Sequence, residues 1–595
     1  MIFDFFVKRK IRRHLDDLLE NPHDAGLSDK LLSFWERKPR PFEAVMHRHA
    51  DEKGWLMKFF DEAPDDTEHR KKRLENQARE TLKWEEFIRL LKAPETGARK
   101  KWVDSSSNRT VDPLLLERPK SLQDIQQIVQ AARSKGVKVR AYGSKHSVSD
   151  VAITTDYMID TGGFGYPLHL DRSLLKAGPA DNELLFETQA GITIQELTFA
   201  LECIDLALPN MGGSNVQTFL GAASTGTHGS GIDLGNYADL IQSLVLVAGD
   251  GNIYRVEPTD GISDPSKYPL DGVTLIQDDD KFHSTTVSMG SMGIIYSVII
   301  AVKKFYYLKE NRTMTTWEDL KPSLVDGKAV GGARDFEVLI NPFKIDGKNS
   351  CIVVNREEVL KNGKPQDLGT VKPSGHRNVL ESFVSHFKFF TEILIAMMNT
   401  FPKEVPKFLE KALKGQQDKN YIDKWYKVLN QGLNQVKNFG TAVELGFPVE
   451  QGEADGKTIY VPAEGSTNYV EATEEIMQLV QELASEETRQ YISSPISLRF
   501  VNKSKAYMAP MYDQYTCMIE VPVLHKVYGS FEIMERIERA MIKRGCRPHW
   551  GLNMDELNAA QVADLYPKTP EFIETRHFFD ADGLFNNSFT NRIGI

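Results

Sequence analysis

Three loops rich in glycine, serine and threonine have the composition of an anion-binding site, and two of them contain a histidine. Their sequences are GSKHS at 143–147, GAASTGTHGSG at 221–231 and GSMGII at 290–295. Small residues let backbone N–H groups approach an anion closely, and hydroxyl side chains add further donors. One such loop alone would be interpreted as a turn. Three together favour a site for a phosphate-bearing cofactor with an attached ring system.

Several other familiar motifs are absent. No G-x-G-x-x-G follows a predicted strand, which disfavours a Rossmann dinucleotide site. The stretch GEADGKT at 452–458 is one residue short of a P-loop and is interpreted as a surface turn. Neither an H-E-x-x-H helix nor a C-x-x-C pair is present, so we predict no metal site.

The elements that must position the first loop follow from local patterns. Ser121 and Asp124 form a capping-box pattern before an apolar helical face, and Gly136 is placed to end that helix. Residues 137–141 alternate like a strand and lead directly into the loop at 143–147. Farther along, Gly249-Asp250-Gly251 predicts a hairpin. We also expect helices at 379–400, 471–484 and 530–544.

Composition limits the possible functions. The chain has 595 residues and a net charge of −10, which argues against a nucleic-acid binder. Four cysteines rule out a disulfide scaffold. Residues 1–100 are highly charged, and we predict a helical extension there. Its first residues either pack on the protein or contact an anionic membrane surface or a partner.

Four segments follow one another in the order RPKSLQDIQQIV, VRAYGSKHS, LPNMGGSNVQTFLGAASTGTHGSG and GSMGIIYSV. This order resembles that of the vanillyl-alcohol oxidase and p-cresol methylhydroxylase (PCMH) flavoproteins. The endings RPHWGLN and YPKTPEFIETRHFFDADGLFNNSF resemble the aldonolactone and alditol oxidases within that group. The resemblance implies an α+β fold with a two-lobed, PCMH-type FAD-binding domain and an α+β substrate domain. We expect a helical extension (1–100), the FAD-binding domain (101–305), a substrate or cap domain (306–490) and a segment completing the active site and the FAD domain (491–595).

The resemblance also implies FAD as the cofactor, bound covalently through His146, with a noncovalent hydrogen bond from His146 as the alternative. Gly212 matches a position where the absence of a side chain leaves room for O₂. The expected FAD-binding residues are Tyr142, Gly143, Ser144, Lys145, His146, Ser147, Gly212, Gly213, Gly221, Ser224, Thr225, Gly226, His228, Gly229, Gly290, Gly293, Ile294 and Ile295.

On the substrate side, Arg499 matches the arginine of the family's Glu-x-Arg pair, whereas Ser497 replaces the glutamate. Leu552 replaces the lysine of an H-W-x-K motif, so we expect a less polar alcohol than a sugar lactone. His549 is the first candidate for the catalytic base. The alternatives to it are Tyr507, Glu337 and Glu520.

These observations predict an FAD-dependent oxidase that takes hydride from a CH–OH group to the flavin and passes electrons to O₂, giving H₂O₂. A dehydrogenase with another electron acceptor and a diverged flavin-binding protein are the alternatives. The expected partners are a small alcohol substrate and O₂, without nucleic acid. We expect a cytoplasmic protein, with possible peripheral membrane or protein contact through residues 1–100.

Overall fold

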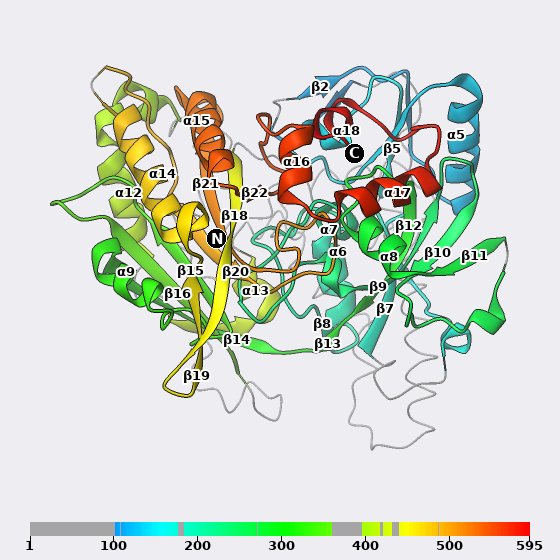
Figure 1. Ribbon diagram of the computed structural model, residues 1–595, viewed down its shortest axis with the longest axis horizontal. Helices are drawn as coiled ribbons and strands as arrows, with labels where there is room; N and C mark the ends of the chain where they lie inside the picture. The colour runs from blue at the N-terminus through cyan, green and yellow to red at the C-terminus, as the bar shows by residue number, and fades with distance from the viewer. Residues whose placement is uncertain are drawn as a thin grey trace, which may run out of the picture.

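The computed structural model describes residues 101–106, 109–176, 184–270, 272–359, 395–416, 420–430, 440–485 and 487–595. The predicted extension at 1–100 and most of the predicted helix at 379–400 lie outside the described residues. Two bodies stand side by side in Figure 1: one holds a three-stranded and a six-stranded sheet, and the other holds a nine-stranded sheet. The predicted α+β class is confirmed. Within the described ranges, no helix is long and apolar enough to cross a membrane.

The three-stranded sheet carries the first glycine-rich loop. Its order is β3 (Leu115–Glu117), β5 (Tyr157–Asp160), β4 (Val139–Tyr142), and both pairings are parallel. Helix α5 (Leu122–Lys135) connects β3 to β4 and begins with the predicted capping box of Ser121 and Asp124. It ends at Gly136, which adopts the left-handed conformation with φ of 64°. Strand β4 therefore delivers the chain directly into the loop at 143–147.

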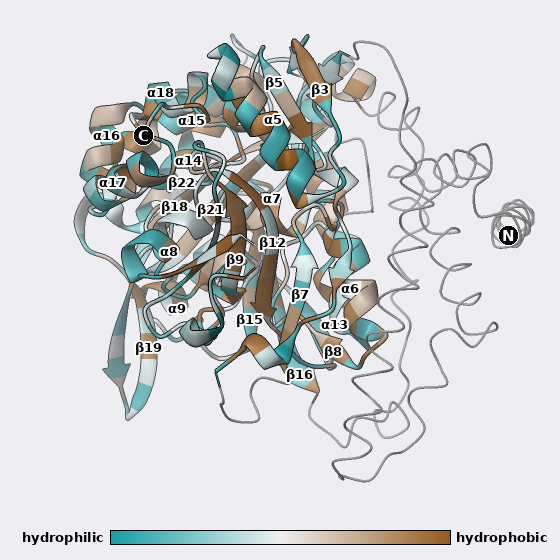
Figure 2. Cartoon of the chain, turned by 90° about the vertical axis from the view of Figure 1, so that its right-hand side faces the viewer, coloured by the Kyte–Doolittle hydropathy of each residue, from teal (hydrophilic) through white to brown (hydrophobic). Residues whose placement is uncertain are grey.

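The six-stranded sheet forms the centre of the same body, and strands β9 and β12 carry much of its hydrophobic surface (Figure 2). The predicted hairpin at 249–251 is confirmed, since β9 and β10 pair antiparallel. The sheet order is β11 (Val273–Gln277), β10 (Ile253–Glu257), β9 (Ile241–Val247), β12 (Ile294–Ala301), β7 (Leu185–Gln189), β6 (Pro167–Leu168). Its helices are α6 (Ile194–Glu202), α7 (Phe219–Ala223) and α8 (Asp279–Thr286).

The nine-stranded sheet is antiparallel throughout and uses strands from both sides of residue 490. Its order is β17 (Tyr421–Lys424), β14 (Tyr307–Thr316), β16 (Ser350–Val359), β15 (Asp335–Ile340), β20 (Ile496–Val501), β21 (Tyr515–Leu524), β18 (Gly440–Ala454), β19 (Lys457–Pro462), with β22 (Arg547–Pro548) also pairing with β18. The helices of this body are α9 (Trp317–Val325), α12 (Val405–Lys414), α13 (Trp425–Leu429), α14 (Tyr469–Leu483) and α15 (Ser530–Lys543). The predicted helices at 471–484 and 530–544 are thus present as α14 and α15.

After β22 the chain returns to the first body. Helices α16 (Ala559–Leu565), α17 (Thr569–Phe579) and α18 (Ser588–Ile593) lie against it in Figure 1. Two short antiparallel pairs complete the fold: β1 (Trp102–Val103) with β2 (Thr110–Val111), and β8 (Leu206–Ala207) with β13 (Lys303–Lys304). Residues near 550 consequently lie where the two bodies meet, with each body supplying part of the surroundings.

Candidate active site

Two adjoining cavities, with about 510 and 650 Å³ of open space, lie between the three glycine-rich loops. Both are lined by Tyr142, Gly143, Thr218, Gly221 and Thr225, so they form one continuous groove. The predicted cofactor residues that line it are Tyr142, Gly143, Ser144, Lys145, His146, Ser147, Gly221, Ser224, Thr225, Gly290, Gly293 and Ile295. The others, which lie outside the two linings, are Gly212, Gly213, Gly226, His228, Gly229 and Ile294.

The lining suits an anionic, ring-bearing molecule. No aspartate or glutamate lines either cavity, whereas Lys145 and Arg140 do. The guanidinium of Arg140 is buried and donates to the carbonyls of Gly290 (3.0 Å) and Phe585 (2.8 Å), which ties the third loop to strand β4. The residues present therefore fit FAD.

His146 lies in a loop with unusual backbone geometry. Its neighbour Lys145 has a φ of 65°, a left-handed conformation that is costly for a residue with a side chain. The His146 Nδ1 atom lies 3.3 Å from the hydroxyl of Ser105. Burial lowers the pKa of His146 to about 4, so its imidazole is neutral at physiological pH. A neutral ring keeps a lone pair on one nitrogen, as attack on a carbon electrophile requires.

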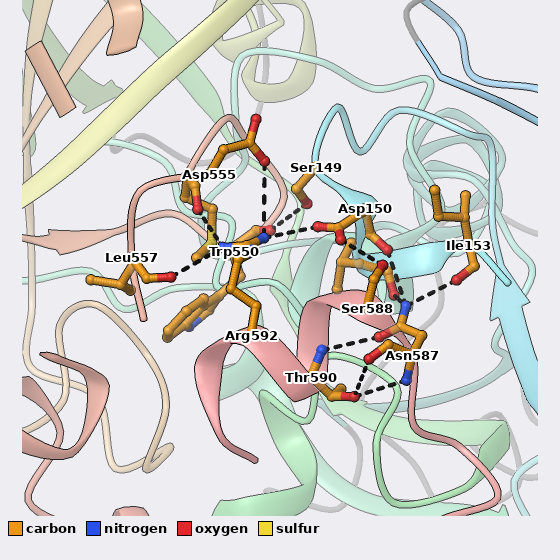
Figure 3. Close-up of polar contacts among 12 residues, drawn as sticks. Ser149, Asp150, Ile153, Trp550, Asp555, Leu557, Asn587, Ser588, Thr590 and Arg592 are labelled. Atoms are coloured by element: carbon orange, nitrogen blue, oxygen red, sulfur yellow. Dashed lines mark hydrogen bonds and ion pairs between the residues drawn. The ribbon is translucent and has the colours of Figure 1, made fainter. Parts of the chain in front are cut away.

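The C-terminal segment anchors the chain that follows His146 (Figure 3). The amide of Asn587 donates to the carbonyls of Asp150 (3.0 Å), Val151 (3.2 Å) and Ile153 (3.0 Å). The carboxylate of Asp150 in turn accepts from Ser588 (2.7 Å) and Arg592 (2.9 Å). Residues far apart in the sequence thus hold the position of the first loop.

His549 follows β22 and lines the cavity beside His146. Its Nδ1 accepts from the backbone N–H of Gly551 (3.0 Å), so the ring proton is on Nε2 and is donated to the hydroxyl of Thr227 (3.0 Å). Burial lowers the pKa of His549 to about 4, although Glu444 opposes that shift. Both ring nitrogens are therefore occupied, and His549 has no free lone pair with which to accept a substrate proton.

A row of charged side chains crosses the nine-stranded sheet next to His549. The Arg499 guanidinium contacts the carboxylates of Glu520, Glu444 (3.7 Å) and Glu337 (4.0 Å). Strand register explains this convergence, because Glu337 lies opposite Arg499, and Glu520 lies opposite both Ser497 and Glu444. Side chains opposite one another, or two residues apart on one strand, share a face of a sheet. The row is thus a consequence of β-pairing.

Glu444 connects this row to the second glycine-rich loop. Its carboxylate lies 3.2 Å from Nε2 of His228, whose Nδ1 faces the carbonyl of Gly229 at 2.7 Å. Its backbone carbonyl also accepts from the N–H of His549 (2.9 Å). Burial would raise the pKa of Glu444, but His228 and Arg499 outweigh it and hold the pKa below its usual range. Glu444 thereby contacts His228, Arg499 and His549.

The remaining predicted site residues lie in different places. Ser497 is buried beside Arg499 and accepts from its Nε (3.3 Å). Tyr507, in the loop between β20 and β21, lies against α8 of the first body: its hydroxyl donates to Asp280, and its backbone N–H donates to the carbonyl of His283 (3.1 Å). The structure does not bring Tyr507 to the charged row. Gly212 is buried, and its N–H donates to the hydroxyl of Tyr237 (2.8 Å).

Sequence reasoning did not single out Glu444, Thr227 or Ser105. A signal for Glu444 was available: it is the only charged residue in the stretch GTAVELGFP at 440–448. A single carboxylate in a buried strand requires a compensating partner, and such groups concentrate at functional sites. Thr227 and Ser105 carry no comparable signal, because hydroxyl residues are common in loops.

Comparison with known proteins agrees with this geometry. A family model described as an FAD binding domain matches residues 113–257, and one described as D-arabinono-1,4-lactone oxidase matches residues 461–593. The chain is an FAD-dependent oxidoreductase. It joins a region that matches an FAD binding domain to a region that matches D-arabinono-1,4-lactone oxidase, in the order that the resemblance in sequence implied.

The relatives of this flavoprotein include a protein named as a dehydrogenase and one named as an oxidase. L-gulono-1,4-lactone dehydrogenase of Mycobacterium tuberculosis is 25% identical, over 83% of this chain and 98% of that protein. L-gulonolactone oxidase of Mus musculus is 21% identical, over 81% of this chain and 95% of that protein. The crystal structure of cholesterol oxidase from B. sterolicum superposes with a TM-score of 0.63 at 13% identity, over 83% of this chain and 97% of that one. This last likeness shows a shared fold.

Proposed function

We propose that this flavoprotein oxidises a CH–OH group of a hydroxyl-rich, lactone-type substrate and is reoxidised by O₂, releasing H₂O₂. The observation that carries the proposal is the charged row around Arg499, next to the cavity of His146 and His549. Arg499 and Glu520 keep 16% and 23% of their side chains exposed, so both are reachable. Such groups bind hydroxyl and carbonyl oxygens well and a hydrocarbon poorly. The row therefore favours a polar substrate over the less polar alcohol expected from Ser497 and Leu552.

FAD, when bound, supplies the acceptor for a hydride from the substrate carbon. The loops at 143–147, 221–225 and 288–290 would hold it. We propose that His146 bonds covalently to the flavin, which its neutral imidazole and its place in the cavity wall support. Acid precipitation tests this link: the yellow colour should stay in the pellet for the unmodified protein and leave it in His146→Ala. Colour released from the unmodified protein would exclude the covalent bond.

Within the charged row, we assign the proton-accepting role to Glu520. Its carboxylate is the most exposed of the three that contact Arg499, since Glu337 and Glu444 keep only 1% and 5% of their side chains exposed. In this proposal, Arg499 donates to the substrate oxygen while Glu520 takes the hydroxyl proton. Both ring nitrogens of His549 already form hydrogen bonds, so His549 would instead hold Thr227 and the neighbouring cavity wall in place.

Anaerobic reduction of the flavin by an aldonolactone such as L-gulono-1,4-lactone tests this assignment. Glu520→Gln should slow flavin bleaching about a hundredfold or more, which is the usual contribution of a general base. The matched control is Glu535→Gln, whose carboxylate is exposed and pairs with Arg539 on the surface of α15. A Glu520→Gln protein that bleaches within threefold of the unmodified rate would show that the proton goes elsewhere. Faster bleaching by a sterol than by any lactone would refute the polar-substrate proposal.

The oxidase assignment rests on the resemblance of Gly212 to a position where the absence of a side chain leaves room for O₂. Gly212 lies outside the linings of the two cavities, and a side chain there would come within 3.2 Å of the His228 carbonyl oxygen. The substrate-reduced protein should reoxidise in air with stoichiometric peroxide, and Gly212→Ala should slow that step more than it slows reduction. If reoxidation requires a dye or a quinone even in the unmodified protein, the chain is a dehydrogenase.

A further inference from the structure

Five large apolar side chains are exposed near one end of the nine-stranded sheet. They account for half of the ten large hydrophobic residues that are exposed in the described chain. The segments that carry them are the helical turn at 395–400, the following residues into α12, and the turn into α15. The residues and their exposed fractions are Met397 (53%), Phe401 (62%), Phe408 (38%), Tyr528 (64%) and Phe531 (50%).

Hydrogen bonds place these segments together. The amide of Asn399 donates to the carbonyl of Lys526 (3.0 Å), and the N–H of Tyr528 donates to the Asn399 side-chain oxygen (2.8 Å). Helix α12 starts four residues after Phe401 and is held to the same end of the sheet by Glu410, which accepts from Ser350 (3.0 Å) and Asn341 (3.3 Å). These segments therefore lie at the same end of the nine-stranded sheet.

The exposed aromatic residues are not the packing face of these helices. On α12, Val405, Leu409 and Leu413 are buried, and on the turn at 395–400, Ile395 and Met398 are buried. Each element thus has its own apolar face against the core. The outward aromatic residues do not contribute to the core, and a cluster of this kind on a soluble surface marks an interaction site.

Lysines surround the aromatic residues. Lys403, Lys407, Lys411, Lys414 and Lys526 are all exposed on the same segments. Three acidic residues lie on these segments: Glu404 pairs with Lys407 (3.1 Å), the buried Glu410 pairs with Lys414 (3.1 Å), and Glu532 pairs with Arg536 (2.8 Å). This surface therefore carries local positive charge on a chain whose net charge is −10.

We propose that this aromatic–lysine surface docks on an anionic lipid bilayer. Aromatic and long apolar side chains enter the boundary between head groups and acyl chains, while flexible lysines reach the lipid phosphates. The composition favours lipid over a protein partner, because lysine is depleted in protein interfaces. A second copy is disfavoured, because a twofold contact would bring the lysines of the two copies together.

Docking here would also orient the enzyme. Strand β21 ends at Leu524, just before Lys526 and Tyr528, and Glu520 lies four residues earlier on the same strand. At about 3.3 Å per residue, the charged row lies roughly 13 Å from this end of the strand. The membrane would then lie close to one end of the active-site row.

Co-sedimentation of the full chain with vesicles tests the proposal. The unmodified protein should bind vesicles of phosphatidylcholine with phosphatidylserine, bind pure phosphatidylcholine weakly, and dissociate in high salt. The variant Phe401→Ser/Tyr528→Ser/Phe531→Ser should lower the bound-to-free ratio at least tenfold. The matched control, Leu114→Ser/Val325→Ser/Phe578→Ser, removes equally exposed apolar side chains elsewhere and should change it less than twofold.

A second set of variants covers the case in which the aromatic changes affect folding. Lys403→Gln/Lys407→Gln/Lys411→Gln keeps every apolar contact and should lower binding about fivefold per lysine, since each is worth about 1 kcal/mol at an anionic surface. Full binding by both the aromatic and the lysine variants would overturn the proposal. The proposal would also be overturned if the unmodified protein did not bind anionic vesicles, or if it self-associated through Phe401 and Tyr528.

Discussion

Replacing Glu444 with glutamine should destabilise the protein strongly, because it removes a buried negative charge that lies against the partly buried Arg499 guanidinium and the His228 ring. Glu444 and His228 keep 5% and 1% of their side chains exposed, and Arg499 keeps 16%. At 3.7 Å and an effective dielectric constant near 20, the attraction between Glu444 and Arg499 is about 4.5 kcal/mol before desolvation. Removing one partner of a buried pair costs about 3–5 kcal/mol. Arg499 keeps Glu520, so we expect about 3 kcal/mol.

The pH dependence provides an independent check of the cause. The pKa of Glu444 in the folded protein lies below that of an unfolded glutamate, which is about 4.3. A depressed carboxyl pKa stabilises the fold fully above the unfolded value and progressively less as pH falls toward the folded one. The difference between unmodified protein and Glu444→Gln should therefore be constant from about pH 6 to 7 and shrink below about pH 4.

Thermal and urea unfolding, followed by fluorescence, would measure these differences, with Glu535→Gln as the matched control at an exposed ion pair. If the nine-stranded body unfolds as one unit, about 3 kcal/mol lowers its Tm by roughly 6–12 °C. The same stability for Glu444→Gln and Glu535→Gln would refute the reasoning. So would a loss that is identical at all pH values, since it would then come from packing and not from charge.

Three further predictions concern the scaffold of the cavity. Gly143→Ala should weaken flavin retention and lower the free energy of unfolding by about 1–3 kcal/mol, because the new methyl group would lie 2.0 Å from the Thr218 hydroxyl. Gly332→Ala, whose methyl group would meet no atom within 4 Å, should change neither the flavin content nor the melting temperature. Asn587→Ala leaves three carbonyls without their shared donor and should raise the rate of amide hydrogen exchange at residues 150–153. An unchanged exchange rate would contradict this prediction. Ser121→Ala should cost about 1 kcal/mol through the lost helix cap, measured by urea unfolding, and a difference below a few tenths would show that the cap is dispensable.

Local features of the fold were predictable because local interactions determine them. The cap at Ser121, the left-handed Gly136 and the hairpin at 249–251 each depend on residues within a few positions of one another. The composition of the glycine-rich loops likewise predicts a cavity. The anchoring of residues 150–153 by Asn587 was not predictable in this way, because it joins positions more than 430 apart in the sequence.

The charged row shows that the motif around Arg499 does not contain all of the charges that gather there in the folded sheet. The sequence places Ser497 two residues before Arg499, and the absence of a carboxylate at that position suggested a less polar substrate. In the folded sheet, Glu520 lies directly opposite Ser497 and contacts the same guanidinium. Antiparallel pairing thus brings a carboxylate to Arg499 from the neighbouring strand. Whether a strand pair supplies the missing charge depends on register, and a shift of one residue would turn Glu520 to the opposite face. The charge of this site therefore depends on how the strands of the sheet pair, and the motif around Arg499 supplies only part of that charge.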